Sequence, residues 1–315
     1  EVLAEAGFDP NLVLLACDTV ESPMAQDLVT HPDVGIVDFT GGNAFGDWIE
    51  ANATQARVYT EKAGVNSIVL DGTDDLRATT GNIAFSLCLY SGQMCTTPQN
   101  IYVPESGIHT SDGICSFDDT VSAIVKAVDW FVSDPARASE VCGAIQSEAT
   151  ADRIQSIAGT GTVLRESTAI ENERFPDART ATPVIMQVDS SDEAIYQQEA
   201  FGPIVYIVRT SDTAESIRLA ADSARRKGGL TAGVWSQDDA IIDDAVCALT
   251  AAGVAVSCNL AGSIWVNQSA AFSDFHVSGG NPAGNATLCD GAFVADRFRS
   301  VASRVMAPVP AEVAD

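Results

Sequence analysis

Short apolar segments alternate with amphipathic segments along most of this chain, and that alternation limits the folds it can adopt. Strands are predicted over residues 67–70, 101–103, 183–188, 204–208, 230–235, 254–258 and 263–267. Helices are predicted between them, over residues 118–132, 150–158, 213–227 and 239–251. A strand that returns through a helix runs parallel to its neighbour. We therefore expect an α/β fold with a mainly parallel sheet.

The first 60 residues carry a second α/β pattern. Strands are predicted over 11–16 and 34–39, and helices over 23–30 and about 47–60. The glycine-rich stretch Thr-Gly-Gly-Asn-Ala-Phe-Gly at 40–46 follows the second strand. A strand, a glycine turn and a helix present backbone N–H groups and a positive helix end to a phosphate. An ordinary turn would explain the same glycines.

Charge narrows the classes of partner. The net charge is −26, and lysine occurs only at 62, 126 and 227. Nucleic acid and anionic membranes require a positive surface, so neither is an expected partner. No apolar run approaches the ~18 residues of a membrane span. Glu1 opens the chain without a basic signal region, and we expect a cytoplasmic protein.

The eight cysteines are scattered and form no Cys-x-x-Cys pair. None of the histidines at 31, 109 and 276 has a cysteine at the spacing typical of metal ligands, so we expect no metal site. A disulfide framework is not expected in a chain of this size, and a reducing compartment fits.

Cys95 has the most informative surroundings of the eight cysteines. It follows a Gly-Gln turn at 92–93, with the apolar run 83–89 before it and the apolar segment 101–103 after it. This context predicts a thiol on a loop between a buried helix and a strand. A thiolate there could act as a nucleophile. The alternative is a small buried side chain with no chemical role.

A second stretch, Glu-Lys-Ala-Gly at 61–64, lies 34 positions before Cys95, counted from Glu61. Together the two stretches resemble the aldehyde dehydrogenase superfamily, which has Glu-x-Gly-Gly followed at this separation by Gly-Gln-x-Cys. The resemblance implies that Cys95 is the nucleophile and Glu61 the general base. Ala63 stands in place of the first glycine, and Val65 where lysine is common.

The resemblance extends to cofactor motifs. Phe-Thr-Gly-Gly at 39–42 stands where the family has Phe-Thr-Gly-Ser, which implies dinucleotide contacts from Thr40, Gly41, Gly42 and Gly46. Glu-Ala-Phe-Gly-Pro at 199–203 resembles the family's Glu-x-Phe-Gly-Pro. By that match Glu199 holds the nicotinamide ribose hydroxyls and Phe201 lies near the nicotinamide. The implied cofactor is NAD or NADP.

The C-terminal stretches 267–276 and 290–299 are similar to the aldehyde dehydrogenases of aerobic phenylacetate degradation. Those enzymes act on the ring-opened CoA semialdehyde, so the resemblance implies a small aldehyde substrate, CoA-linked, with Phe272 in its pocket. It also implies that the chain is the C-terminal portion of the family fold. Residues 1–62 would end a Rossmann-type NAD(P)-binding domain, 63–267 would form the catalytic domain, and 268–315 an arm for homo-oligomer assembly.

The implied reaction is NAD(P)-dependent oxidation of an aldehyde to a carboxylic acid through a Cys95 thiohemiacetal and thioester. Two alternatives stay open at this point. The chain could be a truncated, catalytically silent subunit, or a different cysteine-dependent acyl hydrolase or transferase. The last would need a histidine base, and no histidine here has motif context.

Overall fold

The computed structural model describes residues 1–19, 21–62, 64–260 and 279–285. The chain splits into two compact units, Glu1–Lys62 and Ala63–Asp315. The predicted strand at 263–267, the proposed boundary at 267 and Phe272 all lie outside the described residues. No described helix is long and apolar enough to cross a membrane.

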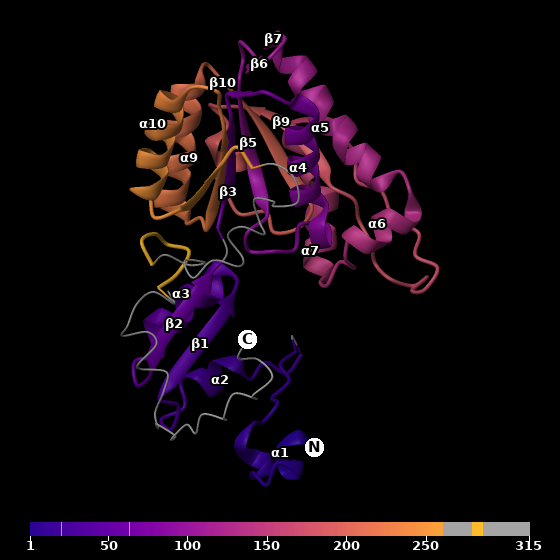
Figure 1. The fold of residues 1–315 in the computed structure, drawn as a ribbon. Helices are drawn as coiled ribbons and strands as arrows, with labels where there is room; N and C mark the ends of the chain where they lie inside the picture. Colours follow the sequence, from indigo (N-terminus) through magenta and orange to yellow (C-terminus); the bar gives the residue numbers. More distant parts are fainter. Residues whose placement is uncertain (20, 63, 261–278, 286–315) are drawn as a thin grey trace, which may run out of the picture. The chain divides into compact units, whose positions relative to one another are not determined.

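The first unit is built on a parallel strand pair. β1 (Ile36–Gly41) pairs with β2 (Arg57–Lys62), and α3 (Asn43–Asn52) connects them (Figure 1). Val37, Ile49 and Ala53 form its small buried core. Its other elements are short: α1 (Val2–Glu5), the 3₁₀ turn η1 (Pro10–Leu12) and α2 (Ala25–Val29).

Two predictions for this unit are wrong. The strand expected at 11–16 is absent: residues 10–12 form η1, and Leu14 and Leu15 are exposed. The helix expected at 47–60 begins earlier, at Asn43, and ends at Asn52. Residues 57–62 form β2 instead, because the run Val-Tyr-Thr at 58–60 has strong strand propensity.

Among its described residues the second unit contains a seven-stranded sheet, and the predicted α/β class with a mainly parallel sheet is confirmed. The strand order is β12-β11-β3-β5-β10-β9-β8, and of these described strands only β8 pairs antiparallel with its neighbour. The strands are β3 (Asn66–Leu70), β5 (Pro98–Pro104), β8 (Thr162–Arg165), β9 (Val184–Asp189), β10 (Ile204–Thr210), β11 (Thr231–Trp235) and β12 (Ala255–Cys258).

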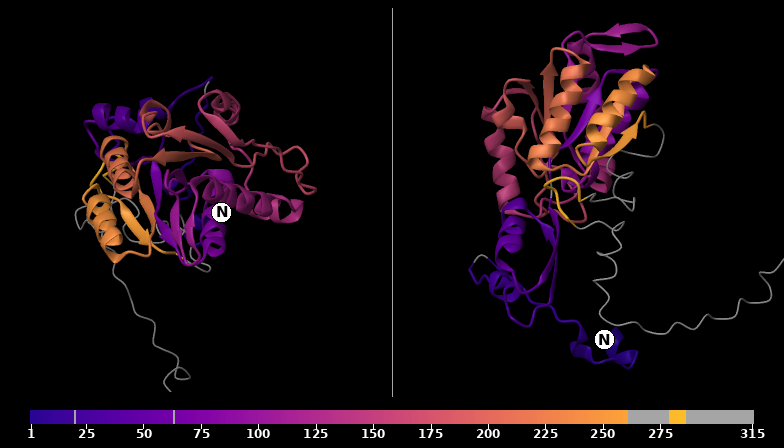
Figure 2. Two further views of the ribbon diagram at one scale, coloured as in Figure 1. Left: turned by 90° about the horizontal axis from the view of Figure 1, so that it is seen from above. Right: turned by 90° about the vertical axis from the view of Figure 1, so that its left-hand side faces the viewer.

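Helices cover both faces of this sheet, as Figures 1 and 2 show. On one side lie α4 (Leu76–Cys88) and α5 (Phe117–Val132), and on the other α9 (Thr213–Lys227) and α10 (Asp239–Thr250). Each face has its own buried cluster. Because both faces are covered, β3 and β5 are buried along their whole length.

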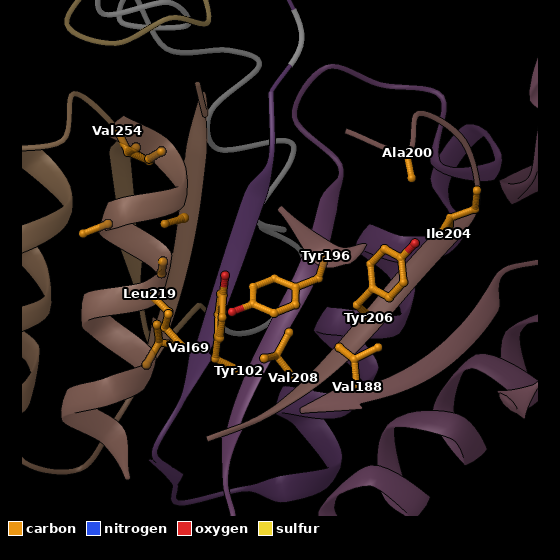
Figure 3. Close-up of a cluster of buried hydrophobic side chains, with 14 of the residues drawn as sticks. Val69, Tyr102, Val188, Tyr196, Ala200, Ile204, Tyr206, Val208, Leu219 and Val254 are labelled. Atoms are coloured by element: carbon orange, nitrogen blue, oxygen red, sulfur yellow. The ribbon is translucent and has the colours of Figure 1, made fainter. Parts of the chain in front are cut away.

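The cluster beneath α9 and α10 holds three buried tyrosines (Figure 3). The rings of Tyr102 and Tyr196 meet edge to face at 6.0 Å between centroids. The Tyr196 hydroxyl donates to the Ser190 carbonyl at 2.8 Å. The cluster therefore anchors the segment after Tyr196, which leads to Glu199.

The remaining elements surround the sheet. They are α6 (Pro135–Val141), α7 (Glu148–Ser156), α8 (Glu193–Tyr196), the 3₁₀ turns η2 (Leu89–Gly92) and η3 (Ile157–Gly159), and a small sheet of β4 (Gly72–Thr73), β6 (Ile108–Thr110) and β7 (Gly113–Cys115).

A candidate active site around Cys95

Cys95 lies on the turn between α4 and β5, in the helix–loop–strand context that the sequence predicts. The helix ends at Cys88, η2 follows, and β5 begins at Pro98. The Thr97 N–H donates to the Met94 carbonyl at 3.0 Å and closes the turn around Cys95. The cysteine is partly exposed.

The chain makes a sharp change of direction just before the turn. Tyr90 and Ser91 have φ of 51° and 53°, and Gly92 has φ of 64°. A Cβ at Gly92 would lie 2.5 Å from the Gly202 carbonyl oxygen, so only glycine permits this approach. The Ser91 hydroxyl can donate a bifurcated hydrogen bond to the carbonyl oxygens of Gly143, at 2.9 Å, and Ala181, at 3.0 Å. The segment is therefore fixed to neighbouring loops.

Asn66, which the sequence analysis did not single out, reaches the same turn. Its Nδ2 donates to the carbonyl oxygens of Cys95 at 2.7 Å and Thr97 at 3.1 Å. Its Oδ1 accepts the N–H groups of Leu230 at 2.9 Å and Thr231 at 3.0 Å. The available sequence signal was a polar residue at the start of a short strand that continues into the apolar run 68–70, and that signal alone does not indicate these partners.

A small cleft brings Cys95 together with the Glu-Ala-Phe-Gly motif. Its walls come from the start of β3, the Cys95 turn and the segment before β10. The lining residues are Gly64, Asn66, Gly92, Met94, Cys95, Thr97, Pro98, Gln99, Glu199, Ala200, Phe201, Gly202 and Ile204. A larger groove between α4 and α5 contains none of the candidate residues.

Glu199 supplies the titratable carboxylate of this cleft. Burial raises the pKa of its carboxyl from 4.5 to about 7, and the positive charge of Arg153 offsets part of that effect. Gln99 holds the segment in place: its Oε1 accepts the Ala200 N–H at 2.7 Å and its Nε2 donates to the Gln198 carbonyl at 3.0 Å. Gln99 is a second positioning residue that the sequence analysis missed.

Phe201, on the same segment, lines the cleft and is 36% exposed. Arg153 donates from Nη1 to the Phe201 carbonyl at 2.7 Å. The exposed ring and the half-buried carboxylate of Glu199 therefore both lie at the cleft, on one short stretch of chain.

The other predicted site residues lie in the first unit. Parallel pairing places Glu61 opposite Thr40 and Lys62 opposite Gly41, at the carboxyl ends of β1 and β2. Gly42 precedes the first turn of α3, whose leading N–H groups have no partner within the helix. The candidate base and the candidate phosphate contacts thus occupy one end of this strand pair.

Gly46 has a packing role in the structure. A Cβ there would lie 2.5 Å from Cδ of Lys62, whose side chain crosses α3 to reach Asp47 at 2.7 Å and Glu50 at 3.0 Å. Burial alone would lower the pKa of Lys62, but the hydrogen bonds and charges of these two carboxylates raise it.

Neither of the two histidines that the structure describes lines the cleft. His109 lies on β6, and His31 lies in the first unit. Within the described ranges, no group of three or more histidine, cysteine, aspartate or glutamate side chains is placed to hold a metal ion.

Both the sequence and the fold of this chain match known proteins. The model of the aldehyde dehydrogenase family matches residues 1–284. An NAD-dependent aldehyde dehydrogenase from Burkholderia multivorans superposes with a TM-score of 0.90 at 53% identity, over 98% of this chain and 56% of that chain.

Curated relatives are more distant in sequence. A geranial dehydrogenase from Castellaniella defragrans is 30% identical over 76% of this chain and 48% of its own. A sulfoacetaldehyde dehydrogenase from Neptuniibacter caesariensis is 26% identical over 76% of this chain and 49% of its own. The chain thus spans about half the length of the curated relatives it matches. On its sequence, its fold and the match over residues 1–284, this chain belongs to the aldehyde dehydrogenase family.

Proposed function

We propose that this chain carries the nucleophile of an NAD(P)-dependent aldehyde dehydrogenase, which oxidises an aldehyde to a carboxylic acid. The observation that supports this most strongly is the cleft shared by Cys95 and Glu199, in a chain of the aldehyde dehydrogenase family. The 53% identity to an NAD-dependent aldehyde dehydrogenase supports the choice of cofactor class.

Cys95 is proposed to attack the aldehyde carbon as a thiolate, giving a thiohemiacetal. The partly exposed position of Cys95 on a tightly held turn suits this role. The Cys95 backbone N–H is proposed as one donor to the oxyanion that forms on the former carbonyl oxygen.

The residues present fit a dinucleotide. Glu199 has no hydrogen-bond donor among the described residues, and a carboxylate in a partly buried cleft suits the two hydroxyls of a ribose. Thr40, Gly41 and Gly42, at the start of α3, are the proposed phosphate contacts. When bound, the nicotinamide would accept hydride from the thiohemiacetal carbon, which becomes the thioester of Cys95.

Glu61 is proposed as the base that activates water for thioester hydrolysis. Its place beside Thr40, at the carboxyl end of β2, sets it next to the proposed phosphate contacts. Water attack on the thioester carbon releases the carboxylic acid and returns the Cys95 thiolate.

The ring-opened CoA semialdehyde of phenylacetate degradation is the proposed substrate. The support is the sequence similarity of residues 267–276 and 290–299, with Phe272 as a proposed pocket residue. Cytoplasmic location and homo-oligomer assembly belong to the same proposal.

Two other functions compete with this one. A cysteine-dependent acyl hydrolase or transferase would require a histidine beside Cys95, and no described histidine lines the cleft. A catalytically silent subunit is the second competitor, and it is separated by activity. Cys95→Ala should abolish NAD(P)-dependent aldehyde oxidation in a complete aldehyde dehydrogenase chain, whereas Cys88→Ala should retain it. Activity in the Cys95 variant would exclude the proposed nucleophile.

A further inference from the structure

Asn66 uses every hydrogen-bonding valence of its side chain, and it does so while 1% exposed. An asparagine amide has two N–H donors and one oxygen with two lone pairs. Here the two donors reach the carbonyls of Cys95 and Thr97, and the oxygen accepts from Leu230 and Thr231. Because the site is buried, each bond lost would leave a polar backbone group without a partner.

The four bonds join three segments that are distant in sequence: the start of β3, the Cys95 turn and the start of β11. The Cys95 side chain packs against a small cluster of Leu230 and Ala283. The Leu230 N–H is bonded to the same amide that holds the Cys95 carbonyl. One side chain thus fixes both the backbone of the cysteine and the wall on which its side chain rests.

The approach of these segments is close and specific. The Val65 N–H donates to the Gly228 carbonyl at 2.9 Å. A Cβ at Gly64 would lie 2.5 Å from the carbonyl carbon of Gly228. The start of β3 is therefore held directly against the loop before β11, and the Asn66 side chain extends from this contact to the Cys95 turn.

The carbonyl bonds matter for chemistry at the thiol. The turn closes on one side through Thr97 N–H to Met94, and Asn66 binds the two carbonyls that flank Thr96. Fixing these carbonyls fixes the peptide planes that orient Cys95. The bonds also turn the two carbonyl oxygens, which carry partial negative charge, toward the Asn66 amide. Carbonyl oxygens turned toward the thiol instead would repel an oxyanion formed there.

We infer that Asn66 is a positioning residue for Cys95, which sets the turn in the orientation that makes its thiol reactive. The inference rests on the proposed function only in taking Cys95 as the nucleophile. Reactivity of the thiol itself provides a readout that needs neither cofactor nor dehydrogenase activity.

The test is the rate at which iodoacetamide labels Cys95 at neutral pH, measured by peptide mass spectrometry. Asn66→Asp keeps the size of the side chain and its acceptors for Leu230 and Thr231, but an ionised carboxylate cannot donate to the two carbonyls. We expect the Cys95 rate to fall at least about tenfold, the factor that corresponds to about 1.4 kcal/mol. Asn66→Ser, which is neutral and shorter, should also slow labelling, by at least about threefold.

A matched control is Asn259→Asp. Asn259 binds the backbone of Ser236, just beyond the other end of β11, with N–H to Oδ1 at 3.1 Å and Nδ2 to carbonyl at 2.9 Å. This control should leave Cys95 labelling within about twofold of the unsubstituted chain, since its partners are far along the strand. Cys88, which is 0% exposed, reports unfolding in every sample.

Several outcomes would overturn the inference. One is an unchanged or faster Cys95 rate in Asn66→Asp while Cys88 stays protected. Another is slow labelling in Asn66→Asp alone, with Asn66→Ser normal, which would show a charge effect. Loss of Cys88 protection in both variants would make Asn66 a residue of stability only. Cys95 labelling no faster than that of the exposed Cys17 in the unsubstituted chain would instead count against the proposed function.

Discussion

Glu199→Gln is expected to stabilise the second unit at neutral and alkaline pH and to leave its stability unchanged in mild acid. Burial raises the pKa of the Glu199 carboxyl from 4.5 to about 7. The folded chain therefore holds this proton more tightly than the unfolded chain does. The stability linked to the proton is fully present below the unfolded pKa of 4.5 and is lost as pH rises through about 7.

The size of the effect follows from the same two pKa values. One pKa unit corresponds to about 1.4 kcal/mol, so the ionised carboxylate costs roughly 3 kcal/mol of unfolding free energy above the window. Glutamine has nearly the same shape as a protonated glutamate and carries no charge at any pH. The variant should thus exceed the unsubstituted chain by roughly 3 kcal/mol at about pH 8 and match it at about pH 4.5.

The assay is urea unfolding at those two pH values, followed by far-UV circular dichroism, whose signal comes mainly from the larger second unit. Glu105→Gln, at an exposed carboxylate of the same unit, is the matched control and should change the two unfolding free energies equally. An equal effect of Glu199→Gln at both pH values would refute the reasoning, and so would destabilisation at about pH 8.

Two further substitutions test the packing that positions the candidate site. Gly92→Ala should lower the free energy of unfolding in urea by at least about 2 kcal/mol, because the added Cβ would meet the Gly202 carbonyl and the residue has a positive φ. The control Gly81→Ala should be neutral or stabilising, since a Cβ there meets nothing within 4 Å. Equal effects of the two substitutions would contradict the close approach at Gly92. Lys62→Met should lower the unfolding free energy of the first unit by about 1–3 kcal/mol, since the variant loses the hydrogen bonds to Asp47 and Glu50. Unfolding of this unit is followed by Trp48 fluorescence, and a change below about 0.5 kcal/mol would contradict the prediction.

Local sequence signals predicted six of the seven strands described for the sheet and missed the edge strand β8, Thr162–Arg165. Helix α9 has the predicted bounds, because the Asp212 side chain caps its first turn and Gly228, with φ of 87°, ends it. The turn that carries Cys95 was also predictable from local sequence, because an apolar helix, a glycine turn and a strand follow one another there. The start of the first unit was not, since the apolar run at 12–15 has strand composition and no strand partner in the described part of the unit.

The positioning residues could not be predicted, because their bonds span long stretches of sequence. Asn66 binds partners between 29 and 165 positions away, and the bonds of Gln99 to the Glu199 segment span about 100 positions. No local pattern carries that information. The resemblance to a known family supplied Cys95 and Glu199, and the structure placed both in one cleft together with the amides that hold their segments.

The most direct test of the central claim is to trap the covalent intermediate. A complete aldehyde dehydrogenase chain that contains these 315 residues would be mixed with an aldehyde and NAD(P), quenched in acid during the first turnover, and digested for peptide mapping. The account predicts an acyl group in thioester linkage on the peptide that contains Cys95, with none in the Cys95→Ala variant. An acyl group on a different residue, or turnover of the Cys95→Ala variant at the unsubstituted rate, would contradict it.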